Sequence, residues 1–344
     1  MKNNIQKYNL KIYINFQIKD AAWGGGNSFL KILKNELITS NHYTKDITDS
    51  DVIIFNGHHH LIETLKLKVK FPNKLFIHRL DGPMNELRVN GALLDFLIKI
   101  FSYNVSDAII FQSKWSMLES IKCGYSDRKK LTIIGNSCDS SIFNKSQKKI
   151  KQSSNKTKIL FASWSNNSTK GLDMLFFLDK NLDFKRYEIN VVGNIENDFT
   201  NINIIGQKNQ HELSKELDKS DIFLFASYKE AYSNMLIEAV ASGLPVITRK
   251  ASSNVEIVLD ERLLFSSGND LLNKIEEVSK NINKDINYKY KIISTKEVAI
   301  KYINFSNDML KNHQKKILKI HKIIFLYVAY YVIKFLIVIR EYLK

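Results

Sequence analysis

Two glutamates, Glu230 and Glu238, lie eight positions apart around the expected start of a helix over residues 233–242. Glu230 falls in the loop before this helix and Glu238 within it, so both carboxylates can face a ligand at the helix N-terminus. The backbone N–H groups near Ser233 and Asn234, together with the helix dipole, favour a phosphate at this point. Carboxylates that bind hydroxyl groups, beside a phosphate site, suit a nucleotide-sugar. The alternative is an ordinary αβ unit with two surface glutamates.

The helix continues into the pattern Ala-x-Ala-x-Gly-x-Pro-Val over residues 239–246. A Glu-x7-Glu pair followed by this pattern resembles the retaining family-4 glycosyltransferases of the GT-B fold, and the resemblance covers about residues 10–310. It implies that Glu238 binds the donor ribose hydroxyls and that Glu230 contacts the donor sugar as a catalytic residue. Tyr232, Ser233 and Asn234 would complete this part of the donor site.

A glycine segment over residues 23–28 follows the first expected strand and opens the first expected helix. Glycines there permit a positive φ and a close approach of backbone to a ligand. The alternative is a tight strand-to-helix turn. Under the resemblance, Gly25 and Gly26 belong to the family's N-domain glycine loop, which lies against the donor phosphates and the acceptor.

Polar residues end the third expected strand, where the sequence reads His78-Arg79-Leu80-Asp81. The carboxyl edge of a parallel sheet is where ligands bind in this architecture. The resemblance implies that His78 approaches the donor sugar as a catalytic residue, and that Arg79 and Asp81 contact the acceptor or brace the loop. A set of structural hydrogen bonds at a turn is the alternative.

The Lys170-Gly171 pair opens the second half of the chain. The resemblance implies a lysine and an arginine that together neutralise the departing diphosphate, with the arginine a few residues before the lysine. Here residues 163–165 read Ser-Trp-Ser, so that arginine is missing. Leaving-group stabilisation would then rest on Lys170, on helix N-termini and on a cation from elsewhere, such as Arg79 or Arg249.

Two glycine-containing segments, residues 192–194 and 205–208, correspond to the family's nucleobase-binding region, and Asn194 is the donor-binding candidate there.

Two other patterns imitate metal sites. In Asp49-Ser50-Asp51 the last aspartate directly precedes an apolar run, so it is expected to start a strand. The three consecutive histidines 58–60 have diverging side chains and no spaced partner, so a cleft-lining loop is favoured over a metal site. We expect neither metal nor cofactor, with the nucleotide-sugar as a substrate.

The elements that position these residues alternate along the chain. Short, β-branched or aromatic runs read as strands of a sheet covered on both faces: residues 11–16, 51–55, 74–78, 108–111, 131–134, 158–162, 188–192, 202–205, 221–225 and 245–248. Helical patterns lie between them: residues 27–37, 87–101, 114–122, 171–179, 210–219 and 233–242. A polar, lysine-rich linker over residues 144–158 separates two such series. The pattern predicts an α/β, GT-B architecture of two Rossmann-like domains facing across a cleft, 1–150 and 151–310.

The composition agrees with two domains that each have a hydrophobic core. The chain has 344 residues, of which 44% are apolar, which excludes wholesale disorder. Two cysteines without Cys-x-x-Cys spacing fit a reducing cytoplasm, and the polar first nine residues predict no signal peptide. A net charge of +16 calls for an acidic partner, either nucleic acid or an anionic membrane.

The charge gathers in the C-terminal tail, residues 311–344, which holds eight basic residues and one acidic residue. The tail also contains the apolar run 323–339, about 25 Å long as a helix and interrupted by Lys334. These features favour a basic and apolar helix on an anionic membrane surface, not needed for the fold. A membrane span and packing onto the protein remain as alternatives; a helix over 296–310 already supplies the final GT-B helix.

The function that these observations favour is a cytoplasmic glycosyltransferase, peripheral on the inner face of the membrane. It would move a hexose-type sugar from a nucleotide-sugar donor to a glycan or lipid-linked acceptor during surface polysaccharide assembly, with retention of configuration. A GT-B sugar-nucleotide epimerase is one alternative. A basic nucleic-acid-binding protein is another, disfavoured because the charge lies on an apolar tail and no aromatic-basic motif is present, so we expect no nucleic-acid partner.

Overall fold

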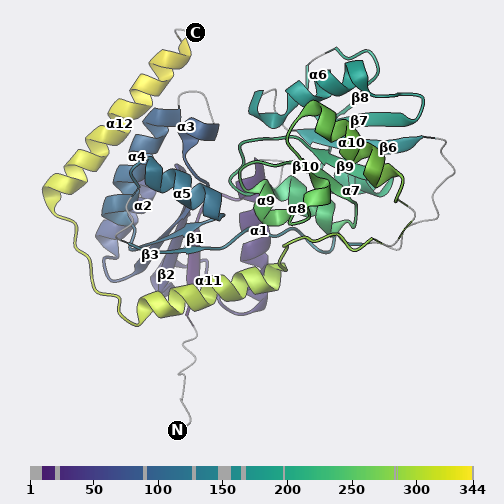
Figure 1. Cartoon of the computed structure of the whole chain (residues 1–344). Coiled ribbons are helices and arrows are strands. Elements are labelled where there is room, and N and C mark those ends of the chain that lie inside the picture. Colours follow the sequence, from purple (N-terminus) through teal and green to yellow (C-terminus); the bar gives the residue numbers. More distant parts are fainter. Residues whose placement is uncertain are drawn as a thin grey trace. The chain divides into compact units, whose positions relative to one another are not determined.

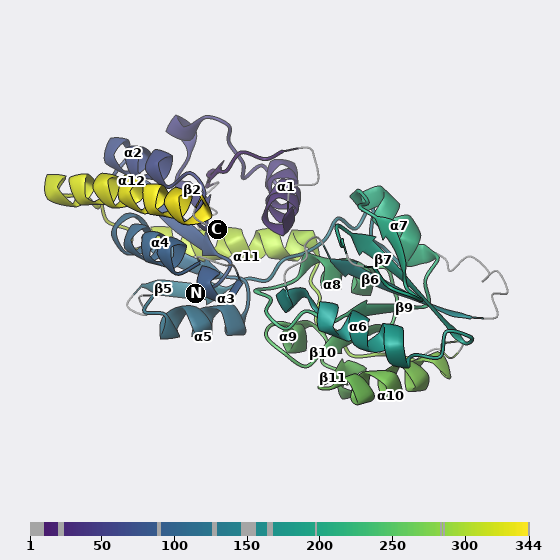
Figure 2. The same cartoon turned by 90° about the horizontal axis from the view of Figure 1, so that it is seen from above.

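The computed structural model describes residues 10–19, 24–87, 91–125, 129–145, 156–163, 168–196, 198–282, 284 and 286–342. Contacts divide these residues into two units, which Figures 1 and 2 show from two directions. The first unit contains residues 10–19, 30–135 and 296–342, and the second contains residues 24–29 and 136–295. The expected boundaries at 150 and 310 differ from this division. Much of the expected linker and the start of the glycine segment lie outside the described residues.

The first unit is built on a five-stranded parallel sheet in the order β1-β2-β3-β4-β5. Its strands confirm the five expected runs within a few residues: β1 (Ile12–Asn15), β2 (Val52–Asn56), β3 (Leu75–Leu80), β4 (Ala108–Phe111) and β5 (Lys130–Ile133). The described helices of this part are α1 (Gly24–Thr39), α2 (Leu61–Lys70), α3 (Met84–Leu87), α4 (Gly91–Val105) and α5 (Lys114–Lys122). The sequence prediction missed α2 and placed the start of α4 within α3.

The second unit holds a six-stranded parallel sheet in the order β11-β10-β9-β6-β7-β8. Its strands are β6 (Thr157–Ser163), β7 (Tyr187–Gly193), β8 (Asn203–Gly206), β9 (Ile222–Phe225), β10 (Val246–Arg249) and β11 (Leu264–Phe265). Its helices are α6 (Leu172–Asn181), α7 (Gln210–Asp218), α8 (Asn234–Ala241), α9 (Asn254–Ile257) and α10 (Gly268–Ser279). Strands β6 and β9 are fully or largely buried, as expected for a sheet covered on both faces. One apolar core fills this unit.

Two C-terminal helices, α11 (Thr295–Leu310) and α12 (Ile320–Tyr342), complete the described chain. Helix α12 packs on α4 and α2 of the first unit, and Figures 1 and 2 show it beside them. Leu326 and Ile333 on its inner side are buried in the same core cluster as Phe101 of α4. The tail was expected not to be needed for the fold. The inner side of α12 contradicts this expectation, because it covers part of that core.

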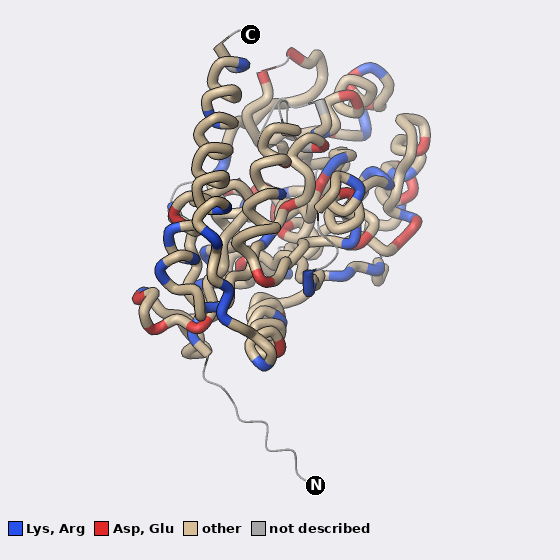
Figure 3. The backbone as a smooth tube through the Cα atoms, turned by 90° about the vertical axis from the view of Figure 1, so that its left-hand side faces the viewer, with Lys and Arg blue, Asp and Glu red and all other residues tan. Residues whose placement is uncertain are grey.

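The opposite side of α12 is apolar and exposed. The segment Ile320–Arg340 is long and apolar enough to cross a membrane by length and composition, and 11% of its most apolar window is buried. In Figure 3 the basic residues gather at the start of this helix and in the segment before it. Helix α12 thus combines protein packing on one side with an apolar exposed surface on the other.

Candidate functional site

The candidate site of the second unit lies where the strand order reverses. Strands β6 and β9 are neighbours, but the chain leaves β6 toward β7 and leaves β9 toward β10, on opposite sides. Loops that leave such a pair of strands diverge at their carboxyl ends, and ligands of open α/β sheets bind in the space that results. The loop after β6 carries Lys170, and the loop after β9 carries Glu230.

These two residues form an ion pair. The Lys170 Nζ lies 2.6 Å from the Glu230 Oε1, and the side chains are 30% and 15% exposed, respectively. The Ser227 hydroxyl donates to the same carboxylate oxygen at 2.8 Å and also contacts the Thr169 carbonyl oxygen at 3.1 Å. The two loops are therefore tied together at the charged pair, and both charges stay partly accessible to a ligand.

Two glycines allow backbone segments to approach each other closely at the carboxyl ends of these strands. Gly171 has φ +89°, and a Cβ there would lie 2.5–2.6 Å from atoms of Ala226, directly after β9. Gly193 has φ +138°, and a Cβ there would lie 1.6 Å from the Ser163 carbonyl oxygen at the end of β6. Side chains are excluded at both positions, because Gly171 meets the loop after β9 and Gly193 meets the end of its partner strand β6.

Arg249, at the end of β10, adds a second cation to this part of the unit. Its guanidinium donates to Asp173 Oδ2 at 2.6 Å and lies over the Tyr228 ring, 5.4 Å from the centroid. The Asn254 amide donates to the carbonyl oxygens of both Ser227 and Arg249, at 2.8 and 3.2 Å. Of the two cations considered as replacements for the missing arginine, Arg249 lies in this loop cluster.

Helix α8 begins beside the same loop. Ser233 is its N-cap, and its Oγ accepts from the Leu236 N–H at 3.3 Å. The Asn234 side chain accepts from the Asn136 amide and donates to the Gly25 carbonyl oxygen, both at 2.8 Å. Tyr232 is half-buried on the core, its carbonyl oxygen accepts from Asn136 at 3.3 Å, and burial raises the pKa of its hydroxyl to about 12.

Glu238 lies inside α8 and is 6% exposed. The Gln210 amide lies 3.5 Å from its Oε1. Burial raises the pKa of the Glu238 carboxyl to about 7, and the contact with Gln210 opposes this shift. The two glutamates of the pair are thus in different settings, one beside a lysine in a loop and the other buried in a helix.

The glycine segment corrects one expectation. The helix α1 begins at Gly24, and neither Gly25 nor Gly26 is among the glycines with a positive φ. Gly25 lies close to the start of α8, where a Cβ at Gly25 would be 3.2 Å from the Asn234 amide nitrogen. Asn194, directly after β7, is exposed.

The candidates at the end of β3 lie in the first unit. His78 is fully buried, its ring stacks on Phe55 with centroids 4.0 Å apart, and its Nε2 lies 2.8 Å from the Gly57 carbonyl oxygen. A carbonyl can only accept, so this nitrogen carries the proton. Burial lowers the pKa of His78 to about 3, and the imidazole is neutral at physiological pH.

Arg79 is also fully buried in β3. Its Nη1 donates to Asn56 Oδ1 at 2.5 Å and to Asp81 Oδ1 at 3.0 Å, and the Gln112 amide donates to the same Asp81 oxygen. This network matches the loop-bracing alternative for Arg79 and Asp81. A buried, paired guanidinium is not available to a diphosphate, so Arg79 does not take the place of the missing arginine.

The residues of the two patterns that imitate metal sites make local contacts within the first unit. Asp51 directly precedes β2, as expected, and its Oδ2 accepts from the Lys11 N–H at 2.8 Å. His58 and His59 stack on each other, and His59 and His60 contact Phe16. Within the described residues, no group of three or more His, Cys, Asp and Glu side chains is arranged to hold a metal ion.

Sequence reasoning missed four residues that shape the site: Ser227, Ser252, Asn254 and Asn136. Ser252 has φ +46°, and its Oγ accepts from the Glu230 N–H at 3.1 Å. Asn254 is fully buried between the ends of two strands. The available signal was the run of small polar residues after each strand, which favours turns but does not say which partners they reach.

Residues 143–294 match the family model described as glycosyl transferases group 1. Among solved structures, the chain is similar to HepE of Anabaena in complex with UDP-glucose (TM-score 0.61, 14% identity, covering 87% of this chain and 97% of that one). Sucrose-phosphate synthase of Thermosynechococcus elongatus gives TM-score 0.54 at 14% identity, covering 86% and 80% of the two chains.

A trehalose-6-phosphate synthase, whose structure was used to study glycosyl transfer with retention, gives TM-score 0.52 at 13% identity, covering 81% and 78%. No curated protein sequence matches the chain. Two parallel-sheet α/β units with these neighbours confirm the predicted GT-B fold. The match to the group 1 glycosyl transferase model lies within the second unit, over residues 143–294.

Proposed function

We propose that the protein transfers a sugar from a nucleotide-sugar donor to a glycan or lipid-linked acceptor, with retention of anomeric configuration. The observation that carries the proposal is the Lys170–Glu230 pair at the carboxyl ends of β6 and β9, beside the N-terminus of α8 and within the family match. The UDP-glucose bound to HepE and the retaining transfer studied in trehalose-6-phosphate synthase support this choice.

In this proposal the cations and the α8 N-terminus hold the donor diphosphate. The bond between the anomeric carbon and the phosphate oxygen breaks, and Lys170 and Arg249 stabilise the negative charge that grows on the leaving group. Glu230 stabilises the positive charge that develops at the sugar ring. The acceptor oxygen forms the new glycosidic bond, and its proton passes to the departing phosphate, so no protein base is required.

Glu238 is the group we assign to the ribose hydroxyls. Its buried carboxylate offers acceptors for two adjacent hydroxyl groups, and hydrogen bonds to a charged acceptor are stronger than neutral ones. The exposed apolar side of α12 and the basic tail support membrane association at the cytoplasmic face, with surface polysaccharide assembly as the process.

The donor site can be tested by thermal stabilisation with UDP-, GDP- and ADP-sugars. We expect one of these classes to raise the melting temperature of the wild type, and Lys170→Met to lose most of that shift. Lys180→Met, an exposed lysine of α6, is the matched control and should respond as the wild type does. Stabilisation of Lys170→Met equal to that of the wild type would contradict the assignment. The anomeric configuration of the product, read by NMR, tests retention.

We also expect transfer to continue in excess EDTA, because Lys170 and Arg249 supply the positive charge that a divalent cation supplies in metal-dependent transferases. The measurement is the initial rate with and without chelator. Loss of transfer that only manganese or magnesium restores would show that this account of the leaving group is wrong.

A further inference from the structure

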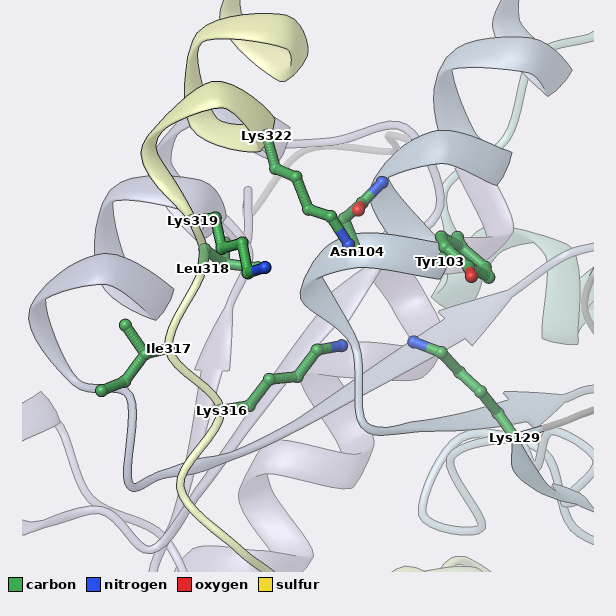
Figure 4. A pocket seen from close by; sticks show the side chains of 8 residues that line it. All are labelled: Tyr103, Asn104, Lys129, Lys316, Ile317, Leu318, Lys319 and Lys322. Atoms are coloured by element: carbon green, nitrogen blue, oxygen red, sulfur yellow. The ribbon is translucent and has the colours of Figure 1, made fainter.

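A pocket of about 370 Å³ opens in the first unit, where the segment before α12 passes the C-terminal end of α4. Figure 4 shows its lining side chains. The polar ones are Tyr103 and Asn104 of α4, Lys129 before β5, Lys316 and Lys319 in the segment before α12, and Lys322 in its first turn. Among the described residues that line it, none has an acidic side chain.

Two of these lysines are held by the end of α4. The Lys129 Nζ donates to the Ser102 carbonyl oxygen at 2.6 Å and contacts Ser106, and the Lys316 Nζ lies 3.3 Å from the Ser106 carbonyl oxygen. These carbonyls carry only the partial negative charge of a helix C-terminus. In Figure 4 the amino groups of Lys129 and Lys316 point toward each other.

The nearby carboxylate of Asp107 opposes the fall in the pKa of both Lys129 and Lys316, and so offsets their charges in part. Asp107 Oδ2 accepts from the Lys68 Nζ at 2.8 Å and from the Phe76 N–H at 2.9 Å, so it is already paired with a fifth lysine. Burial and the charge of Lys316 lower the pKa of Lys129 to about 7, and burial also lowers the pKa of Lys316. A bound anion would offset the repulsion that these side chains experience.

An apolar surface begins at the same place. The residues that we call the outer stripe recur at helical spacing along α12 and the segment before it, and each is more than half exposed: Ile317, Ile320, Ile324, Val328, Tyr331, Phe335, Val338 and Tyr342. Ile317, 68% exposed, also lines the lysine pocket. Positive charge and exposed apolar surface therefore meet at one residue, which favours a ligand that joins a phosphate to a hydrocarbon chain.

We propose that this four-lysine pocket binds the phosphate of an anionic membrane lipid, whose acyl chains lie along the outer stripe of α12. The inference rests on the membrane association in the proposed function and adds a defined headgroup site to it. Because the inner side of α12 is packed on α2 and α4, a lipid held here keeps the helix along the membrane surface.

The test is sedimentation with vesicles of phosphatidylcholine alone or with phosphatidic acid. The pocket pair is Lys319→Gln with Lys322→Gln, and the matched control is Lys315→Gln with Arg340→Gln, which removes the same charge from outside the pocket. We expect the pocket pair to weaken binding to the acidic vesicles about tenfold more than the control pair, since both lose the same general attraction. Equal losses would overturn the headgroup site.

A second experiment, with soluble ligands, distinguishes binding of a lipid from binding of free phosphate. Monomeric dihexanoyl phosphatidic acid should raise the melting temperature of the wild type but not of the pocket pair, and inorganic phosphate should do so far less. If inorganic phosphate gives the same shift as the short-chain lipid, the site is one for free phosphate and the proposal fails. Nucleotide-sugar binding, measured on both pairs, should be unchanged, so failure here and failure of the donor site are distinguishable.

Discussion

Glu230 and Glu238 share one motif but differ in the physical state of their carboxyl groups. Glu230 faces Lys170 and accepts from Ser227 in a partly accessible loop. Glu238 is turned into the unit from the middle of α8, where burial raises its pKa to about 7. Glu230 is therefore placed beside a positive charge, and Glu238 is placed where its carboxyl group titrates near neutral pH.

The titration of Glu238 predicts that donor binding depends on pH. The ionised carboxyl accepts hydrogen bonds from hydroxyl groups more strongly than the protonated one, and with a pKa of about 7 the ionised fraction falls below that pH. Affinity for the nucleotide-sugar should therefore rise from about pH 6 to about pH 8, by up to about tenfold per unit below the pKa. Calorimetric titration across this range provides the measurement.

The matched control for this prediction is Glu238→Gln, which keeps the size of the side chain and cannot titrate. Its donor affinity should be weaker than that of the wild type and level across the same pH range. An equally steep profile in the variant would assign the titration to another group.

At the scale of the elements, the turn between β6 and α6 decides where Lys170 lies. Gly171 is the N-cap of α6 with φ +89°, and its backbone rests against Ala226. The loop after β9 is joined to this turn, because the Tyr228 N–H donates to the Thr169 carbonyl oxygen at 3.1 Å. The position of the lysine thus depends on the contact between two loops and not on its own helix.

Gly171→Ala should displace this turn. The left-handed conformation costs a residue with a Cβ about 1–2 kcal/mol, and the overlap with Ala226 adds about 1–3 kcal/mol if the turn cannot move. We expect a large loss of donor binding together with lower stability in urea. Gly124→Ala in the first unit is the control: it has φ +81°, and a Cβ there would meet only Lys99 side-chain atoms at 3.5–4.0 Å, so it should carry the conformational cost alone. Equal effects of the two substitutions would contradict the close-approach argument.

At the scale of the whole molecule, α12 presents two apolar sides to two environments. Its inner side, with Leu326 and Ile333, is buried against the first unit, and its outer stripe is exposed. Exposed apolar surfaces of this extent mark interaction sites in soluble proteins. The helix therefore belongs to the first unit and at the same time supplies the surface that we assign to the membrane.

Substitutions on the two sides of α12 should separate these roles. Leu326→Ala removes a fully buried side chain and should lower the free energy of unfolding by about 2–5 kcal/mol. Phe335→Glu, at a position 66% exposed, should change stability little and weaken binding to vesicles. The measurements are urea unfolding and vesicle sedimentation. Unaltered vesicle binding of Phe335→Glu would remove the outer stripe from the proposed membrane surface.

The sequence by itself predicted every strand except β11, most of the helices and the glutamate motif. Buried parallel strands are short and apolar throughout, so their periodicity is visible without a structure, as β2 and β9 demonstrate. Helix α2 was missed because it follows the histidines 58–60 without a capping signal, its N-cap His60 having φ +52°. Helix α10 was also not predicted, although its N-cap Ser267 accepts from the Asp270 N–H, so a local capping signal alone was not sufficient.

Only the tertiary structure decided which charges meet. Lys170 and Glu230 lie 60 residues apart in the chain. They meet because β6 and β9, which precede them, are neighbours in the sheet although β7 and β8 lie between them in the sequence. The choice between Arg79 and Arg249 likewise depended on burial, since one is enclosed in β3 and the other ends a strand beside the site. The two sides of α12 were indistinguishable in sequence because both are apolar; packing against α2 and α4 made one of them core and left the other exposed.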